Sequence, residues 1–131
     1  MRRFSIILVT LALGFISCQE TNSSDIKVVS PEEMKSLIEM DEVQLVDVRT
    51  EAEYRLEHIA KSQNIDVRSP NFDEEIQKLD KDRPVIVYCR SGIRSAKCVA
   101  KLKDAGFVKI YDLNGGIAKW KYKGLEVETK S

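Results

Sequence analysis

A six-residue segment carries the residue types best suited to chemistry in this chain. It reads Cys89, Arg90, Ser91, Gly92, Ile93, Arg94 and follows the apolar run VIVY at 85–88. Gly92 permits a turn with positive φ, which would curl the loop so that successive backbone N–H groups point inward. Inward N–H groups, a helix N-terminus and two arginines all favour a thiolate, the nucleophilic form of cysteine. The segment therefore predicts a nucleophilic thiol in an anion-binding loop. The alternative, a small buried core residue, explains neither the glycine nor the arginines.

The segments around this loop alternate between strands and helices. Strands are expected at 26–29, 43–48, 63–65, 84–88 and 108–113. Capping boxes at Ser30–Glu33 and Thr50–Glu53, a cap at Asn71 and a helix from about Arg94 to Ala105 are predicted between them. The last helix follows Asn114-Gly115-Gly116 and carries Ile117 and Trp120. This alternation predicts an α/β fold: an open, parallel five-stranded sheet with helices on both faces. Ligands of such sheets bind at the carboxyl ends of the strands, where Cys89 lies.

Length and composition restrict the protein classes. With 131 residues and 43% hydrophobic residues, the chain suits one globular domain and excludes intrinsic disorder. Three cysteines are too few for a disulfide scaffold. Residues 18–82 hold 8 Lys and Arg against 17 Asp and Glu, whereas residues 83–131 hold 11 against 4. The basic part suggests a site for an anionic ligand, although solvated basic helix faces would also explain it.

The N-terminus has the order of an export signal. Arg2 and Arg3 precede an uncharged apolar segment from Phe4 to Ser17, which as a helix would be shorter than a membrane core. Ser17 followed by Cys18 resembles a bacterial lipoprotein signal, in which the cysteine is acylated. We therefore expect residues 1–17 to be a signal peptide, 18–25 a lipid-attached tether, 26–127 the domain and 128–131 a tail. This arrangement would hold the protein in the cell envelope by a lipid anchor at Cys18.

Four sequence blocks resemble the rhodanese family of single-domain sulfurtransferases. They are LVDVRTEAEYRLEHI at 45–59 with QNI at 63–65, VIVYCRSGIRSAKCVAKLKDAGF at 85–107, and YDLNGGIAKW at 111–120. The resemblance implies that Cys89 takes a sulfur atom from thiosulfate or a related donor and passes it to an acceptor through a persulfide. It also implies a small anionic sulfur donor, a thiol or cyanide-like acceptor and, as a further partner, a sulfur-accepting protein. We expect no cofactor, no metal and no nucleic-acid partner.

The resemblance also suggests roles for individual residues. Arg90 and Arg94 would orient a dianionic donor, with Arg94 favoured because it starts the helix. Asp47 and Arg49 match the family's Asp-Val-Arg sequence, either as a buried pair that braces neighbouring loops or as direct substrate contacts. His58 is expected to have a structural hydrogen-bonding role, since a thiol of low pKa needs no general base. Cys98 shares a helix stripe with Leu102, so core packing is favoured over a resolving thiol.

Other functions remain open at this stage. A related fold serves cysteine phosphatases and arsenate reductases, whose Cys-x₅-Arg loop is one residue longer than the segment here. A smaller ring of N–H groups suits a single sulfur better than a tetrahedral oxyanion. A membrane-tethered sulfur carrier, which would deliver a persulfide to a partner protein, would use the same residues as the enzyme. An inert binding module would not need the cysteine and arginines.

Overall fold

The computed structural model describes Gly14 and residues 23–130. Five strands and five helices alternate along this part of the chain: β1 Asp25–Val29, α1 Pro31–Glu39, β2 Gln44–Asp47, α2 Glu51–Leu56, β3 Gln63–Asn64, α3 Phe72–Ile76, β4 Val85–Tyr88, α4 Ile93–Asp104, β5 Lys109–Leu113 and α5 Gly116–Tyr122. The expected signal peptide and Cys18 lie outside the described residues. None of the described helices has the length and apolar character needed to cross a membrane.

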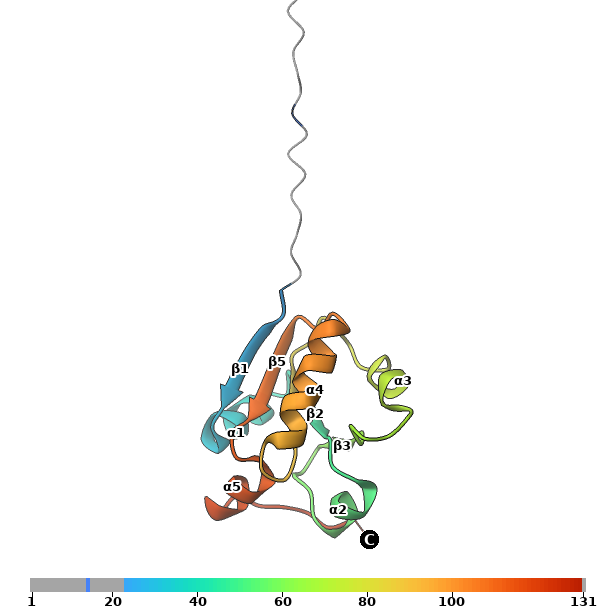
Figure 1. Ribbon diagram of the computed structural model, residues 1–131. Coiled ribbons are helices and arrows are strands. Elements are labelled where there is room, and N and C mark those ends of the chain that lie inside the picture. Colours follow the sequence, from blue (N-terminus) through green and yellow to red (C-terminus); the bar gives the residue numbers. More distant parts are fainter. Residues whose placement is uncertain (1–13, 15–22, 131) are drawn as a thin grey trace, which may run out of the picture.

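The strands form one parallel sheet in the order β1-β5-β4-β2-β3. This confirms the predicted open five-stranded parallel sheet. Strand β4 lies at its centre, and all four of its residues are buried, as the apolar VIVY run predicts. The strands β1 and β5 run toward the end of the molecule that carries α2 and α5 (Figure 1). Cys89 therefore emerges at the carboxyl edge of the sheet, where the sequence places it.

Helices cover both faces of the sheet, and each face has its own core. Val85 and Val87 point to the face covered by α3 and α4, where they pack with Phe72, Cys98 and Leu102. Ile86 and Tyr88 point to the opposite face and pack with residues of α1 and α5, among them Met34, Ile117 and Trp120. Figure 1 shows α4 crossing in front of the sheet and α1 behind it. The alternation of side chains along β4 thus fixes which helix lies on which face.

The predicted helix starts differ in how completely they form. Thr50 and Glu53 make the full capping box, with a hydrogen bond in each direction. At α1, Ser30 accepts the Glu33 N–H at 3.1 Å, but the structure shows no reciprocal bond.

The expected side-chain cap at Asn71 is wrong. Asn71 occupies the N-cap position of α3 but makes no side-chain cap bond, because its backbone (φ −92°, ψ 5°) is not extended as capping requires. The helix itself is short: it ends at Ile76, and Leu79 is buried just beyond it.

Candidate active site

The last helix holds the Cys89 loop in place through its first turn. The N–H of Ile117 donates to the Cys89 carbonyl at 2.9 Å, and the N–H of Ala118 donates to the Arg90 carbonyl at 3.1 Å. This close approach requires glycine at 116, where φ is +61° and an added Cβ would lie 2.5 Å from the Cys89 oxygen. The Gly115-Gly116 pair therefore lets α5 meet the backbone of the reactive loop directly.

Inside the loop, the sulfur of Cys89 faces hydrogen-bond donors. Gly92, at φ +111°, turns its N–H toward Cys89 Sγ at 3.0 Å, and Ser95 Oγ lies 3.6 Å from the same sulfur. Burial alone would raise the pKa of Cys89. The Ser95 hydroxyl and the N–H groups of Ser95, Gly92 and Ser91 outweigh it, so the pKa is lowered. The predicted inward N–H groups are thus present, and they favour the thiolate.

Arg94 does not point into open solvent at this site. Its two terminal nitrogens donate to the carboxylate of Glu53 at 2.6 and 2.8 Å, and only 14% of its side chain is exposed. The hydrogen bond from Arg94, opposed by burial and assisted by Thr50, lowers the pKa of Glu53 to about 2. Arg94 therefore links α4 to α2. The sequence predicts that its guanidinium group faces the donor, whereas in the structure this group is paired with Glu53. Arg90 is exposed, as are Ser91 and Ile93.

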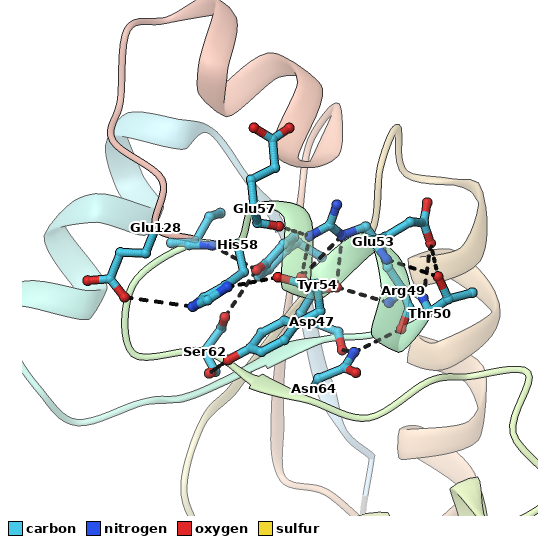
Figure 2. Close-up of polar contacts among 12 residues, drawn as sticks. Asp47, Arg49, Thr50, Glu53, Tyr54, Glu57, His58, Ser62, Asn64 and Glu128 are labelled. Atoms are coloured by element: carbon cyan, nitrogen blue, oxygen red, sulfur yellow. Dashed lines mark hydrogen bonds and ion pairs between the residues drawn. The ribbon is translucent and has the colours of Figure 1, made fainter. Parts of the chain in front are cut away.

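Asp47 and Arg49 form a buried ion pair behind the loop. Arg49 Nη2 donates to Asp47 Oδ2 at 2.7 Å and to the Glu57 carbonyl at 2.6 Å, and the two side chains are 4% and 0% exposed. Asn64 donates to the carbonyl oxygens of both Asp47 and Arg49 (Figure 2). This geometry braces β2 against β3 and α2. Arg49 also lines the pocket described below, which leaves the second interpretation, a direct contact with substrate, open.

His58 belongs to a structural network. Its Nδ1 lies 2.9 Å from the Tyr54 carbonyl oxygen, its ring stacks on Tyr54, and its Nε2 lies 3.7 Å from Glu128 Oε2 (Figure 2). The backbones of His58 and Glu128 exchange two hydrogen bonds of 2.8 and 2.7 Å. These contacts tie the C-terminal segment to α2, and none of them reaches Cys89.

Cys98 lies in the core on α4, as its helix stripe predicts. Burial first, then the nearby Asp112, raises the pKa of its thiol to about 12. Such a thiol stays protonated, so its environment fits core packing rather than a resolving role.

Sequence reasoning missed two residues of this site. Ser95 is fully buried beside the sulfur. It follows Arg94 in the first turn of α4, where a hydroxyl can reach back to the loop, so a signal was present. The sequence identifies Glu53 only as a capping residue. Its pairing with Arg94 could not be predicted, because the two residues are 41 positions apart in the sequence.

A pocket opens beside the Cys89 loop. Its volume is about 310 Å³, and its walls are Arg49, Glu53, Leu56, Glu57, Arg90, Ile117, Ala118 and Lys121. A larger hollow of about 520 Å³ lies between α1, α5 and the C-terminal segment, and none of the expected site residues lines it. Among the residues that the structure describes, no group of three or more His, Cys, Asp or Glu side chains is placed to hold a metal.

Cys89 thus lies in a curled six-residue loop at the end of a buried strand, and its sulfur accepts the Gly92 N–H. Residues 30–123 match the Rhodanese-like domain family, and the chain belongs to this family.

Relatives and solved structures agree with this assignment. The chain is 35% identical over 95 residues to the thiosulfate sulfurtransferase GlpE of Coxiella burnetii, a match that covers 72% of this chain and 87% of that protein. It is 32% identical over 108 residues to the probable adenylyltransferase/sulfurtransferase MoeZ of Mycobacterium tuberculosis, covering 82% of this chain but only 28% of that longer protein. The crystal structure of a rhodanese-related protein from Thermoplasma volcanium matches with a TM-score of 0.71 and 29% identity, covering 79% of this chain and 99% of the other.

Proposed function

We propose that this protein is a sulfurtransferase that moves a sulfane sulfur from thiosulfate or a related donor to a thiophilic acceptor through a persulfide on Cys89. The observation that carries the proposal is the environment of the sulfur: Cys89 Sγ accepts the Gly92 N–H at 3.0 Å, and its pKa is lowered despite burial, by Ser95 and the loop N–H groups. The similarity to proteins named sulfurtransferases supports the same chemistry.

In the first half-reaction, the Cys89 thiolate attacks the outer sulfur of the donor. With thiosulfate, the bond between the two sulfurs breaks, sulfite leaves with the electron pair, and Cys89 becomes an anionic persulfide. No proton moves in this step, which agrees with the absence of His58 from the immediate surroundings of the sulfur. The N–H groups that face Sγ stabilise the thiolate and, after transfer, the persulfide.

In the second half-reaction, a thiophilic acceptor attacks the outer sulfur of the Cys89 persulfide. With cyanide, thiocyanate leaves the site and the Cys89 thiolate is regenerated. We expect a small acceptor to approach through the pocket beside the loop, which Arg49, Arg90 and Lys121 line. The backbone bonds from α5 to the Cys89 and Arg90 carbonyls would hold the loop in the same shape through both steps.

Mass spectrometry of the protein after incubation with thiosulfate tests the proposal. We expect Cys89 to gain the mass of one sulfur atom, and cyanide to remove it as thiocyanate. A protein that remains unmodified but hydrolyses aryl phosphates would instead be a phosphatase of the related fold. A protein that loads one sulfur but turns over no small acceptor would be a carrier for a partner protein.

We further propose that the domain is held in the cell envelope by a lipid on Cys18. This proposal is based on the sequence, in which Arg2 and Arg3 are followed by an apolar segment and then by Ser17-Cys18, the order of a lipoprotein signal. Two or three acyl chains would anchor the protein firmly, because each buried CH₂ contributes about 0.8 kcal/mol. Fractionation of cells expressing the native chain or Cys18→Ala tests this: we expect only the native chain in the membrane fraction. Equal membrane association of both would rule out anchoring at Cys18.

A further inference from the structure

Most of the positive charge around the reactive loop is already paired with acids. Arg94 donates twice to Glu53, and Arg49 donates to Asp47 at 2.7 Å. Lys121, on α5, lies 2.6 Å from Glu57 across the pocket. Arg90 is exposed and makes no ion pair with any residue that the structure describes. Of these four cations, which line the pocket or begin α4, only Arg90 is uncompensated, so most of the positive charge that faces the pocket is neutralised.

The pairing of Arg94 is persistent rather than incidental. The Glu53 carboxylate also accepts hydrogen bonds from the N–H and the hydroxyl of Thr50, both at 3.0 Å. These bonds hold the carboxylate in place from its own helix, and Glu53 remains ionised because its pKa is lowered to about 2 by Arg94 and Thr50, against burial. An anionic donor would have to compete with a two-point contact to a fixed carboxylate in order to recruit Arg94.

Donors differ in the charge that the leaving group carries. Thiosulfate releases sulfite, a dianion, whereas an alkyl persulfide RS–SH releases the monoanion RS⁻. In the second case the Cys89 thiolate bonds to the outer sulfur, the S–S bond of the donor breaks, and Cys89 keeps that sulfur as –S–SH while RS⁻ takes a proton from water. A single free cation and a set of N–H groups match the smaller charge.

We propose that Glu53 sets the donor specificity of this site, by holding Arg94 so that thiol persulfides are preferred to thiosulfate. This inference rests on the proposed function. Glu53 is a specificity-determining residue that acts through Arg94, and Leu56, one turn further along α2, gives the pocket an apolar wall against which the carbon chain of a thiol persulfide can lie.

The test compares two donors, 2-hydroxyethyl persulfide (whose carbon chain carries no charge) and thiosulfate, on matched variants with cyanide as acceptor. We expect the native protein to have the higher kcat/KM with the alkyl persulfide. Glu53→Gln keeps an oxygen for the Thr50 N–H but removes the charge that holds Arg94, so we expect the ratio of thiosulfate to persulfide kcat/KM to rise about tenfold, mainly through a lower KM for thiosulfate. The control Glu51→Gln removes a carboxylate of the same helix whose pair with Arg55 is exposed, and it should leave the ratio unchanged.

Two more variants test whether Glu53 acts through Arg94. Adding Arg94→Ala to Glu53→Gln should abolish the rise, because the freed cation is then missing. Glu53→Asp, which shortens the reach to Arg94, should move the ratio in the same direction by a smaller factor, and it decides the matter if Glu53→Gln does not fold. An unchanged ratio in folded Glu53 variants, or a native preference for thiosulfate, would overturn the inference while leaving sulfur transfer intact. If neither donor modifies Cys89, the proposed function itself fails.

Discussion

Cys89 and Cys98 are equally shielded from solvent, each 1% exposed, yet the pKa values of their thiols are shifted in opposite directions. Burial acts on both in the same direction and favours the protonated form. At Cys89, hydrogen bonds from Ser95 and the loop N–H groups outweigh burial and lower the pKa. At Cys98, burial and the neighbouring Asp112 raise the pKa to about 12. Reactivity in this fold therefore depends on the groups that face the sulfur, and solvent exposure alone does not predict it.

The difference originates in the position of each cysteine relative to helix α4. Cys89 precedes the helix, and the first N–H groups of a helix have no partner within it. The left-handed turn at Gly92 directs such groups at the sulfur. Cys98 lies within α4, where N–H groups are consumed by the helix itself, and its side chain packs among Leu102, Phe107 and other apolar residues. The same helix thus activates the thiol at its start and leaves the thiol within it inert.

The largest effect is expected from replacing the sulfur at the helix start. Cys89→Ser should reduce sulfur transfer to background, because a serine hydroxyl is not ionised at neutral pH and cannot carry a sulfane sulfur. Cyanide trapping of thiocyanate measures the activity, and circular dichroism checks that the variant folds. Appreciable thiocyanate formation by Cys89→Ser would remove Cys89 from the mechanism.

This comparison also shows which parts of the site the sequence could predict. The apolar run VIVY and the segment from Cys89 to Arg94 locate a thiol at a strand end, since burial patterns and glycine turns are local signals. The helix stripe likewise predicts Cys98 as a core residue. The Thr50–Glu53 capping box was predicted and confirmed. However, a local pattern cannot show that the same Glu53 carboxylate reaches Arg94 on another helix.

Three further features could not be predicted from the sequence, each for a different physical reason. Asn71 has the right residue type at a helix start, but the preceding turn fixes its backbone outside the extended region, and its N–H donates to Ser69 Oγ instead. The contact of Ser95 with the sulfur depends on how tightly the loop curls, which residue types alone do not determine. The order of the strands, with β1 at the edge beside β5, likewise depends on packing across the whole sheet.

A smaller effect is expected from weakening the environment of Cys89 without removing the sulfur. Ser95→Ala deletes the side chain that contributes most to lowering the Cys89 pKa. A hydrogen bond to a charged group is worth about 1.5–3 kcal/mol, so the pKa should rise by roughly one to two units. The pH profile of iodoacetamide alkylation should shift to higher pH by the same amount.

A helix serine remote from the site provides the control for this experiment. Ser36 donates to the Glu32 carbonyl within α1, so Ser36→Ala should leave the alkylation profile of Cys89 in place. If the profile of Ser95→Ala coincides with that of the native protein, the backbone N–H groups alone would account for the low pKa.

The smallest effect on sulfur transfer is expected at Cys98. Cys98→Ala should keep most of the activity while lowering the free energy of unfolding by about 1–2 kcal/mol, because it leaves a small cavity against Leu102. How the stability difference between the native protein and Cys98→Ala varies with pH tests the raised pKa of Cys98 more directly. The folded protein retains the Cys98 proton up to a pKa of about 12, whereas the unfolded thiol loses it near 8.5. The stabilisation is therefore fully present below pH 8.5 or so and is lost as pH rises, by about 1.4 kcal/mol per pH unit.

The two thiols act on stability with opposite signs, so the measurement needs a background that lacks Cys89. A lowered pKa stabilises the folded state above the unfolded pKa and loses this contribution as pH falls, which would partly mask the behaviour of Cys98. Urea unfolding of Cys89→Ser with and without Cys98→Ala, at pH 8 and pH 10, isolates the second thiol. We expect the stability difference between the two proteins to shrink, and to reverse if its value at pH 8 is small, with a change of about 2 kcal/mol across this range. A difference that stays constant with pH would mean that Cys98 ionises as readily in the folded protein as in the unfolded chain, and the contrast with Cys89 would then rest on reactivity alone.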